Sequence, residues 1–202
     1  MTQIAGLDVS RETYDQLTGF VGLVEKWTPK INLISKASVA EIWDRHIVDS
    51  AQIYGMAPSS GHWLDIGSGG GFPAVVVAIL SKGDRATHQF TLIESDQRKC
   101  AFLRTASREL NLDLKVISKR IEAVDSISAD ILTARALTDL DGLLSFADRH
   151  LNAVGMALFP KGETWKKEQT AAQERWSYSS EVIKSITNPA AAVLKIQDIA
   201  RV

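Results

Sequence analysis

The sequence predicts an α/β fold built on a seven-stranded, mostly parallel sheet. A glycine-rich turn joins a short apolar strand (residues 63–66) to an apolar helix (residues 73–80), strand and helix patterns then alternate as far as residue 175, and two strand patterns surround a turn at Asn188-Pro189. Alternating strands and helices are typical of a parallel sheet covered by helices, and a closing hairpin adds an antiparallel strand. With 202 residues, the chain can bury a full core as one compact unit.

The first 60 residues are expected to form a wholly helical extension, ahead of the sheet domain of residues 61–202. Ser10 is a candidate N-cap, and apolar residues then recur every three or four positions between residues 14 and 27. Thr28-Pro29 should end this first helix, because the residue before a proline is disfavoured in the α region.

A capping box at residues 38–41 predicts a second helix over residues 39–54. Arg45 and Asp49 project opposite its apolar stripe, four residues apart and able to pair. One interpretation is a surface ion pair beside a core histidine. In the other, Arg45 and His46, with Asn32 upstream, line the entrance to a ligand pocket and contact the substrate.

The glycine turn itself is a candidate ligand site. Gly67, Gly69 and Gly71 can adopt backbone angles that side chains forbid, so the main chain can approach a ligand closely. Free N–H groups at the start of the following helix point toward that ligand. Asp65, at the carboxyl end of the preceding strand, can accept a hydrogen bond from an ammonium group or hold the turn.

The next strand, over residues 90–94, ends in an acidic residue. Glu94 follows the turn at close to the interval of about 20 residues that separates such turns from a ribose-binding carboxylate. The dinucleotide fingerprint G-x-G-x-x-G would need glycine where Phe72 stands. The spacing therefore favours a turn that binds S-adenosylmethionine over a nicotinamide or flavin site, and a glycine turn with no ligand is the third alternative.

The rest of the chain continues the alternation. Further strands are expected over residues 115–118, 130–133, 155–159, 179–186 and 192–196, and helices over residues 97–110, 140–151 and 163–175. Ligands of open α/β sheets bind beyond the carboxyl ends of the strands. Ile121 and Glu122 should therefore pack on and bond an adenine ring, whereas the basic side of the 97–110 helix is either solvated or in contact with RNA.

The residues after the fourth strand narrow the chemistry. Methyltransferases that act on exocyclic amines often carry N-P-P-Y or D-P-P-Y there, and this chain has Thr133-Ala-Arg135. No obvious group manages a departing amine proton. Guanine N7 has a free lone pair, so an enzyme acting on it has only to align the reactants and exclude water. The absence of a base is consistent with N7 transfer.

Six motifs carry a family resemblance. In chain order they are Asn32-Leu33, Arg45-His-Ile-Val-Asp-Ser50, Asp65-Ile-Gly-Ser-Gly-Gly-Gly-Phe-Pro73, Arg120-Ile-Glu122, Thr133-Ala-Arg-Ala136 and Lys161-Gly162. Together they resemble the bacterial 16S rRNA guanine-N7 methyltransferase family, also called the glucose-inhibited division protein B family, over essentially the whole chain.

The resemblance implies a Rossmann-like class I methyltransferase that depends on S-adenosylmethionine. Its substrate would be N7 of one guanosine in the decoding-region loop of 16S rRNA, in free RNA or in a precursor of the small ribosomal subunit. The resemblance also implies cofactor contacts at Gly67, Phe72, Ile121, Glu122 and Arg135.

Arg135 is the candidate catalytic residue. In one interpretation it is a strand-end arginine that pairs with Glu122 or Asp139. In the other, its guanidinium bonds the cofactor or a phosphate of the incoming RNA. Lys161 is a candidate contact to the RNA backbone near the same rim.

Composition sets the general class of protein. The chain is 45% hydrophobic and 23% charged with a net charge of −1, typical of a soluble globular protein. No apolar run is long enough to span a membrane, and the N-terminus lacks a secretory signal. The single cysteine, Cys100, fits a reducing cytosol. We therefore expect a cytoplasmic protein with no membrane partner. The sequence leaves the oligomeric state open, and our expectation is a monomer with no metal.

Other functions stay open at this point. One is a methyltransferase of another RNA or of a small molecule, or an oxidoreductase on a similar sheet. Another is a non-catalytic RNA-binding module that has kept the fold, although the intact glycine turn and Glu94 argue against it.

Overall fold

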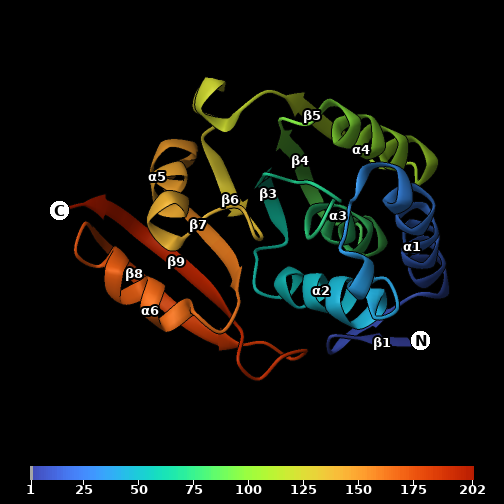
Figure 1. The fold of residues 1–202 in the computed structure, drawn as a ribbon, viewed down its shortest axis with the longest axis horizontal. Coiled ribbons are helices and arrows are strands. Elements are labelled where there is room, and N and C mark those ends of the chain that lie inside the picture. The colour runs from blue at the N-terminus through green and yellow to red at the C-terminus, as the bar shows by residue number, and fades with distance from the viewer. Residues whose placement is uncertain (1) are drawn as a thin grey trace.

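The computed structural model describes residues 2–202 and centres on one seven-stranded sheet (Figure 1). The strands lie in the order β5-β4-β3-β6-β7-β9-β8. Their bounds are Ser60–Ile66 (β3), Thr87–Glu94 (β4), Leu114–Ser118 (β5), Ala129–Thr133 (β6), Leu151–Lys161 (β7), Trp176–Lys184 (β8) and Ala192–Arg201 (β9). Strands β3 to β7 pair in parallel, and β9 is antiparallel to both β7 and β8. The predicted sheet is confirmed.

Helices cover both faces of this sheet. They are α1 (Arg11–Ile31), α2 (Asp49–Tyr54), α3 (Ala74–Gly83), α4 (Gln97–Glu109), α5 (Leu140–His150) and α6 (Trp165–Ala172). Figure 1 shows α1 to α4 gathered in one half of the molecule and α5 and α6 in the other.

Neighbouring strand residues belong to two separate cores. Trp63 and Leu158 pack with α1, α3 and α4, whereas Leu64 and Phe159 pack with α5. Successive side chains of a strand point to opposite faces. A strand buried on both faces is apolar throughout, which explains the continuous apolar runs in the sequence.

The first residues form a small hairpin and not the predicted helix. Strands β1 (Thr2–Ile4) and β2 (Leu7–Val9) pair antiparallel. Ala5 and Gly6 between them have φ values of 53° and 79°, as in tight two-residue hairpin turns. The expectation of a wholly helical extension was wrong here, because three-residue strands are too short to show a periodic pattern.

The end of α1 also differs from the prediction. Thr28-Pro29 does not stop the helix, which continues to Ile31 and closes at Asn32 in the left-handed conformation (φ 51°). Pro29 lies in the last turn, where its missing N–H removes a single backbone hydrogen bond. The Asn32 N–H then bonds the carbonyl of Thr28 and completes the turn.

The second helix, predicted over residues 39–54, begins later than expected and has two parts. Ser35, and not Ser38, caps a short 3₁₀ helix over Lys36–Ser38. A π-helical segment, Trp43–Val48, follows and leads directly into α2. A π-helix bonds residues five apart, so the side chains after it are rotated from their α-helical positions.

Candidate active site

The glycine turn lies between the carboxyl ends of β3 and β4. Gly67 and Gly69 have φ values of 64° and 50°, in the left-handed region that favours glycine. The N–H groups of Gly67 and Ser68 donate to the Ile93 carbonyl at 2.9 and 3.2 Å. The turn is thereby fixed to the strand that carries Glu94.

Glu94 holds the turn and still offers acceptors. Its Oε2 accepts a hydrogen bond from Gly69 N, and its Oε1 accepts one from Asp96 N, both at 2.8 Å. A carboxylate has about four lone-pair sites. Roughly two of them therefore remain for the hydroxyl groups of a ligand.

Asp65 lies at the end of β3, next to the turn, and is 1% exposed. Its Oδ1 accepts a hydrogen bond from Thr133 Oγ1 at 2.6 Å, whereas its Oδ2 has no partner among residues 2–202. Burial raises the pKa of Asp65 to about 6, and the hydrogen bond from Thr133 only partly opposes this. A buried acceptor without a partner suits a donor or cationic group of a ligand.

A cleft of about 460 Å³ opens beside the glycine turn; we call it the first cleft. The residues predicted from the sequence that line it are Gly67, Gly69, Glu94, Ile121 and Glu122. Ile121 is buried and supplies an apolar wall, whereas Glu122 is exposed and offers a carboxylate.

This lining fits S-adenosylmethionine. Glu94 offers acceptors to a ribose, and Ile121 offers an apolar surface to an adenine ring. Asp65 does not line the cleft, but it lies next to the glycine turn, and its buried Oδ2 is an acceptor for an ammonium group. A Cβ at Gly67 would lie 2.7 Å from Leu137 Cδ1. Leu137 could move aside, but the left-handed φ of 64° at Gly67 favours glycine there, so the bare backbone stays at the edge of the cleft.

Gly71 and Phe72 lie outside the first cleft. A Cβ at Gly71 would come within 2.6 Å of Val75 Cγ2, so glycine is required there for packing against α3. Phe72 is 5% exposed, and its ring centroid lies 4.8 Å from that of His46. Packing accounts for both residues, and their contact with a cofactor stays a prediction.

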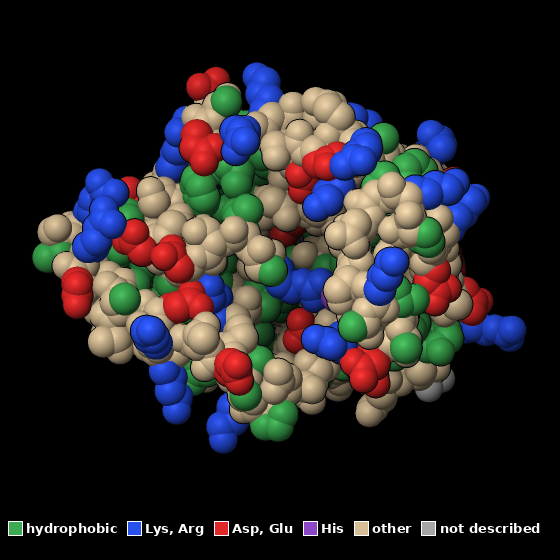
Figure 2. Space-filling view, in the orientation of Figure 1, with side chains coloured by type: hydrophobic (Ala, Val, Ile, Leu, Met, Phe, Trp, Pro, Cys, Tyr) green, Lys and Arg blue, Asp and Glu red, His purple; other side chains and the backbone are tan. Residues whose placement is uncertain are grey.

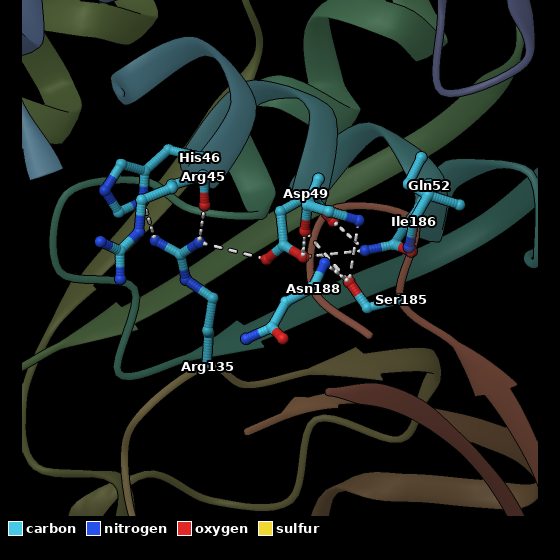
Figure 3. Close-up of polar contacts among 9 residues, drawn as sticks. Arg45, His46, Asp49, Gln52, Arg135, Ser185, Ile186 and Asn188 are labelled. Atoms are coloured by element: carbon cyan, nitrogen blue, oxygen red, sulfur yellow. Dashed lines mark hydrogen bonds and ion pairs between the residues drawn. The ribbon is translucent and has the colours of Figure 1, made fainter. Parts of the chain in front are cut away.

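Arg135, just after β6, is held by groups from the segment at residues 45–49 (Figure 3). Its Nη2 donates to His46 Nδ1 at 2.6 Å. Its Nη1 donates to the carbonyl of Arg45 at 3.3 Å and lies 3.5 Å from Asp49 Oδ2. The guanidinium carbon also lies 5.2 Å from the centroid of the Phe72 ring. The site therefore fixes this side chain on several sides.

His46 acts as the acceptor for Arg135. Burial, together with the charges of Arg135 and Arg45, lowers the pKa of His46 to about 4, so the ring is neutral at pH 7. A guanidinium can only donate hydrogen bonds, so Nδ1 is the acceptor and Nε2 carries the proton. Within residues 2–202 this Nε2 is buried without a partner.

The pairing suggested for Arg45 and Asp49 was wrong. Arg45 pairs with Glu41 at 3.3 Å and not with Asp49, because the π-helical segment Trp43–Val48 rotates Asp49 away from it. Asp49 faces Arg135 instead.

Arg135 itself pairs with neither of the two acidic residues suggested by its place at a strand end. Glu122 lines the first cleft, and Asp139 caps α5 by accepting a hydrogen bond from Gly142 N at 3.0 Å. The acidic partner of Arg135 is Asp49, which lies far from it in the sequence, so no local spacing could predict the pair.

A second cleft, of about 710 Å³, lies on the other side of Arg135. The predicted residues that line it are Arg45, His46, Arg135 and Lys161. Ala136 lines both clefts, so they meet directly after Arg135. Figure 2 shows a hollow near the centre of this face, with basic side chains inside it and acidic side chains around it.

Lys161 forms an ion pair and a hydrogen bond within the protein. Its Nζ lies 2.5 Å from Glu168 Oε2 and donates to the carbonyl of Thr138 at 3.2 Å. Burial opposes ionisation of Glu168, but hydrogen bonds from Lys161 and Thr164 outweigh it and hold the pKa of this carboxyl below its usual range. Asn32 is exposed at the end of α1 and lines neither cleft.

Three further features bear on the class of protein. Among residues 2–202, no group of His, Cys, Asp and Glu side chains is arranged to hold a metal ion. No helix in the described part of the chain is long and apolar enough to cross a membrane. Cys100 is buried, and its thiol donates to the carbonyl of Glu94 at 3.2 Å, which is a packing role.

Sequence reasoning missed several residues of the second cleft. Asp49, Gln52 and the turn at residues 185–191 all contribute to its lining. Asp49 stands inside one of the quoted motifs, yet its partners Arg135 and Thr187 lie far from it in the sequence. The motif marked the residue but gave no signal for its contacts.

Comparisons with known proteins show which proteins the chain resembles. A family profile described as rRNA small subunit methyltransferase G matches residues 13–196. The ribosomal RNA small subunit methyltransferase G of Ruegeria pomeroyi is 53% identical over 196 residues, covering 97% of this chain and 96% of that protein. The protein of the same name from Gluconobacter oxydans is 45% identical over 194 residues, covering 96% of this chain and 98% of that one.

Solved structures share the fold at low identity. A TehB-like SAM-dependent methyltransferase from Corynebacterium glutamicum matches with a TM-score of 0.59 and 14% identity, covering 90% of this chain and 98% of that one. TYW2 of M. jannaschii in complex with AdoMet matches with a TM-score of 0.58 and 15% identity, covering 84% and 78%. These likenesses confirm the predicted Rossmann-like class I methyltransferase fold.

Proposed function

The chain belongs to the rRNA small subunit methyltransferase G family, and from this premise we propose that it methylates N7 of one guanosine in the decoding-region loop of 16S rRNA, with S-adenosylmethionine as the methyl donor. The observation that carries the proposal is the meeting of the two clefts at Ala136. One cleft offers acceptors for a nucleoside with an ammonium tail. The other presents Arg135, a basic residue suited to a nucleic acid.

The first cleft and the neighbouring Asp65 supply the groups that would hold the cofactor. Glu94 would accept hydrogen bonds from the ribose hydroxyls, Ile121 and Glu122 would contact the adenine ring, and Asp65 would accept a hydrogen bond from the ammonium group. When bound, the cofactor supplies a methyl group on a positively charged sulfur.

The contribution of the chain to the reaction is position, because N7 needs no proton removed. Arg135 has five N–H groups. Three of them reach His46, Arg45 and Asp49, which leaves about two for the substrate or the cofactor. Because these partners and Phe72 hold the guanidinium still, the free donors keep one direction.

The partner is 16S rRNA, either free or in a precursor of the small subunit. Binding should weaken as salt rises, because contacts to phosphates release counterions. We propose that the protein acts as a monomer. The substrate places the reaction in the bacterial cytoplasm.

The test is methyl transfer from labelled S-adenosylmethionine to small-subunit rRNA, offered as naked RNA and as assembled subunits. N7-methylguanosine makes RNA break at that nucleotide under borohydride and aniline, so the label and the break should coincide. Glu94→Gln removes the charge and keeps the size, and should lose cofactor affinity by about tenfold or more. Label at another position, or no label in either substrate, would contradict the proposal.

Replacing Arg135 should stop the reaction without unfolding the protein. Arg135→Ala is expected to lower kcat by about 100-fold or more, with an unchanged far-UV circular dichroism spectrum. Arg135→Lys keeps the charge but not the planar fork, so it should recover little. Arg11→Ala, which removes an exposed pair with Asp15 on α1, is the control. Normal turnover by Arg135→Ala would remove this residue from the site.

A further inference from the structure

The turn at residues 185–191 joins β8 to β9 and has a fixed shape. Ser185 Oγ accepts from the N–H groups of Thr187 and Asn188, both at 3.3 Å. Asn188 Oδ1 accepts from Ala190 N at 3.0 Å. Ser185 N donates to the carbonyl of Ala191 at 3.1 Å and closes the turn.

This turn is attached to α2 by side chains (Figure 3). Thr187 Oγ1 donates to Asp49 Oδ1 at 3.1 Å, and the backbone N–H of Ile186 donates to Gln52 Oε1 at 3.2 Å. Gln52 is 7% exposed, and its Nε2 donates to the same Asp49 oxygen at 2.9 Å. Two of these hydrogen bonds join the turn to α2, and the third, within α2, holds the Gln52 and Asp49 side chains together.

One carboxylate therefore connects two parts of the second cleft. Asp49 Oδ1 holds the turn, while its Oδ2 lies 3.5 Å from Arg135 Nη1. The side chains of Asp49 and Arg135 are 18% and 19% exposed, so solvent only partly screens this pair. Asp49 therefore fixes the place of the turn relative to the arginine, which Arg45 and His46 also hold from the other side.

Asn188 is the residue that the turn presents to the cleft. It is exposed and lines the second cleft. In Figure 3 its side chain extends from the turn toward Arg135. Its Oδ1 is used inside the turn, whereas its amide NH₂ has no partner within the described chain. An amide NH₂ donates to the phosphate and carbonyl oxygens in which RNA is rich.

We propose that the 185–191 turn forms the far wall of the RNA site, where the Asn188 amide donates to the bound strand. Asp49 is the positioning residue that sets this wall relative to Arg135. The inference rests on the proposed function and goes beyond it by assigning a binding role to the C-terminal hairpin.

Thr187 offers a test of the link. Thr187→Val keeps the shape of the side chain and removes the hydroxyl, which contacts Asp49 Oδ1 at 3.1 Å and Ser185 Oγ at 3.0 Å. With small-subunit rRNA as the varied substrate, this variant should raise KM about tenfold and leave kcat within about twofold. S-adenosylhomocysteine affinity should not change, because the first cleft is untouched. Thr187→Ser should restore KM, and Thr18→Val, on the exposed face of α1, controls for the loss of a threonine hydroxyl.

Asn188 offers a second test that does not depend on the first. Asn188→Asp keeps the oxygen that accepts from Ala190 N and loses the NH₂ donor, and should raise KM about tenfold. Ala190→Asp adds the same charge to the same turn and should raise KM by less than about threefold. Because Asn188 is exposed, this pair tests the proposal even if Thr187→Val does not fold.

The outcomes separate the two proposals. If the parent protein methylates no RNA, the proposed function is wrong. If the parent is active and both Thr187→Val and Asn188→Asp keep its KM, the turn is no part of the site and the inference alone fails. Equal KM values for the two aspartate variants would assign the effect to charge and overturn the role of Asn188.

Discussion

His46 can accept a hydrogen bond from Arg135 only while its ring is neutral. Burial, with the charges of Arg135 and Arg45, holds its pKa at about 4 in the folded protein, below the ordinary value of 6.5. The folded state therefore favours the neutral ring. The stability that this contact contributes is complete above pH 6.5 and is lost as the pH falls toward 4. Arg135 thus keeps its acceptor at neutral pH.

Asp65 gives a prediction of the opposite sign. Burial raises its pKa to about 6, so between its ordinary 3.8 and 6 the folded state holds a proton that the unfolded state releases. Stability falls as pH rises through that window. Asp65→Asn should therefore be more stable than the parent by about 3 kcal/mol above pH 6 and equal to it near pH 4, by urea unfolding. Calorimetry with S-adenosylhomocysteine at pH 7.5 should show weaker binding by about tenfold or more. Unchanged affinity would separate Asp65 from the cofactor.

At the residue scale, the sequence was most informative next to strand ends. Glu94 and Ile121 could be placed because polar and apolar residues that follow parallel strands gather at one edge of the sheet. Gly71 was assigned to the cofactor because of its spacing, yet its neighbours are Val75 and Phe20. Spacing shows that a residue must be glycine, but not whether a ligand or a side chain occupies the space.

At the scale of elements, the strands and the helices of the sheet domain could be predicted, with bounds a few residues too short for most strands. These elements bury long apolar patterns, and such patterns are the main sequence signal of helices and strands. The π-helical segment Trp43–Val48 could not be predicted, because its extra residue per turn has no compositional mark. That one shift decides which partners Arg45 and Asp49 find.

Lys161 connects elements, and this gives the next prediction. Its ammonium joins the end of β7 to Glu168 on α6 and to the carbonyl of Thr138. With side chains 9% and 20% exposed, breaking the pair by Lys161→Met should cost about 3 kcal/mol in urea unfolding.

Lys161→Met combined with Glu168→Leu is the matched control, and it should be more stable than the single variant because no buried charge is left alone. If Lys161→Met instead keeps full stability and raises KM for RNA, the lysine contacts the substrate, as the sequence suggested.

At the scale of the whole molecule, the N-terminal segment and the sheet share one core. Phe20 of α1 is fully buried, and its ring lies 5.2 Å from that of Phe72, which follows the glycine turn, and 6.3 Å from that of Phe102 on α4. The residue beneath Arg135 therefore rests on the first helix. The division into an extension of residues 1–60 and a methyltransferase unit of residues 61–202 stays a prediction.

Phe20→Ala should weaken both the fold and the site. The cavity is expected to cost about 3–5 kcal/mol of unfolding free energy, and the loss of support for Phe72 should lower kcat below that of the parent at a temperature where both are folded. Lys26→Ala, at an exposed position of the same helix, should change stability by less than about 0.5 kcal/mol. A variant with reduced stability but parental kcat would show that α1 supports the fold alone.

Ala136 is the one lining residue that the two clefts have in common. Because the clefts share so little, we expect neither reactant to obstruct binding of the other. The two substrates should then bind in random order, and initial-rate kinetics that showed an ordered mechanism would contradict this. S-adenosylhomocysteine could leave and S-adenosylmethionine could bind while the RNA is still held. Slow release of the RNA need not delay replacement of the cofactor.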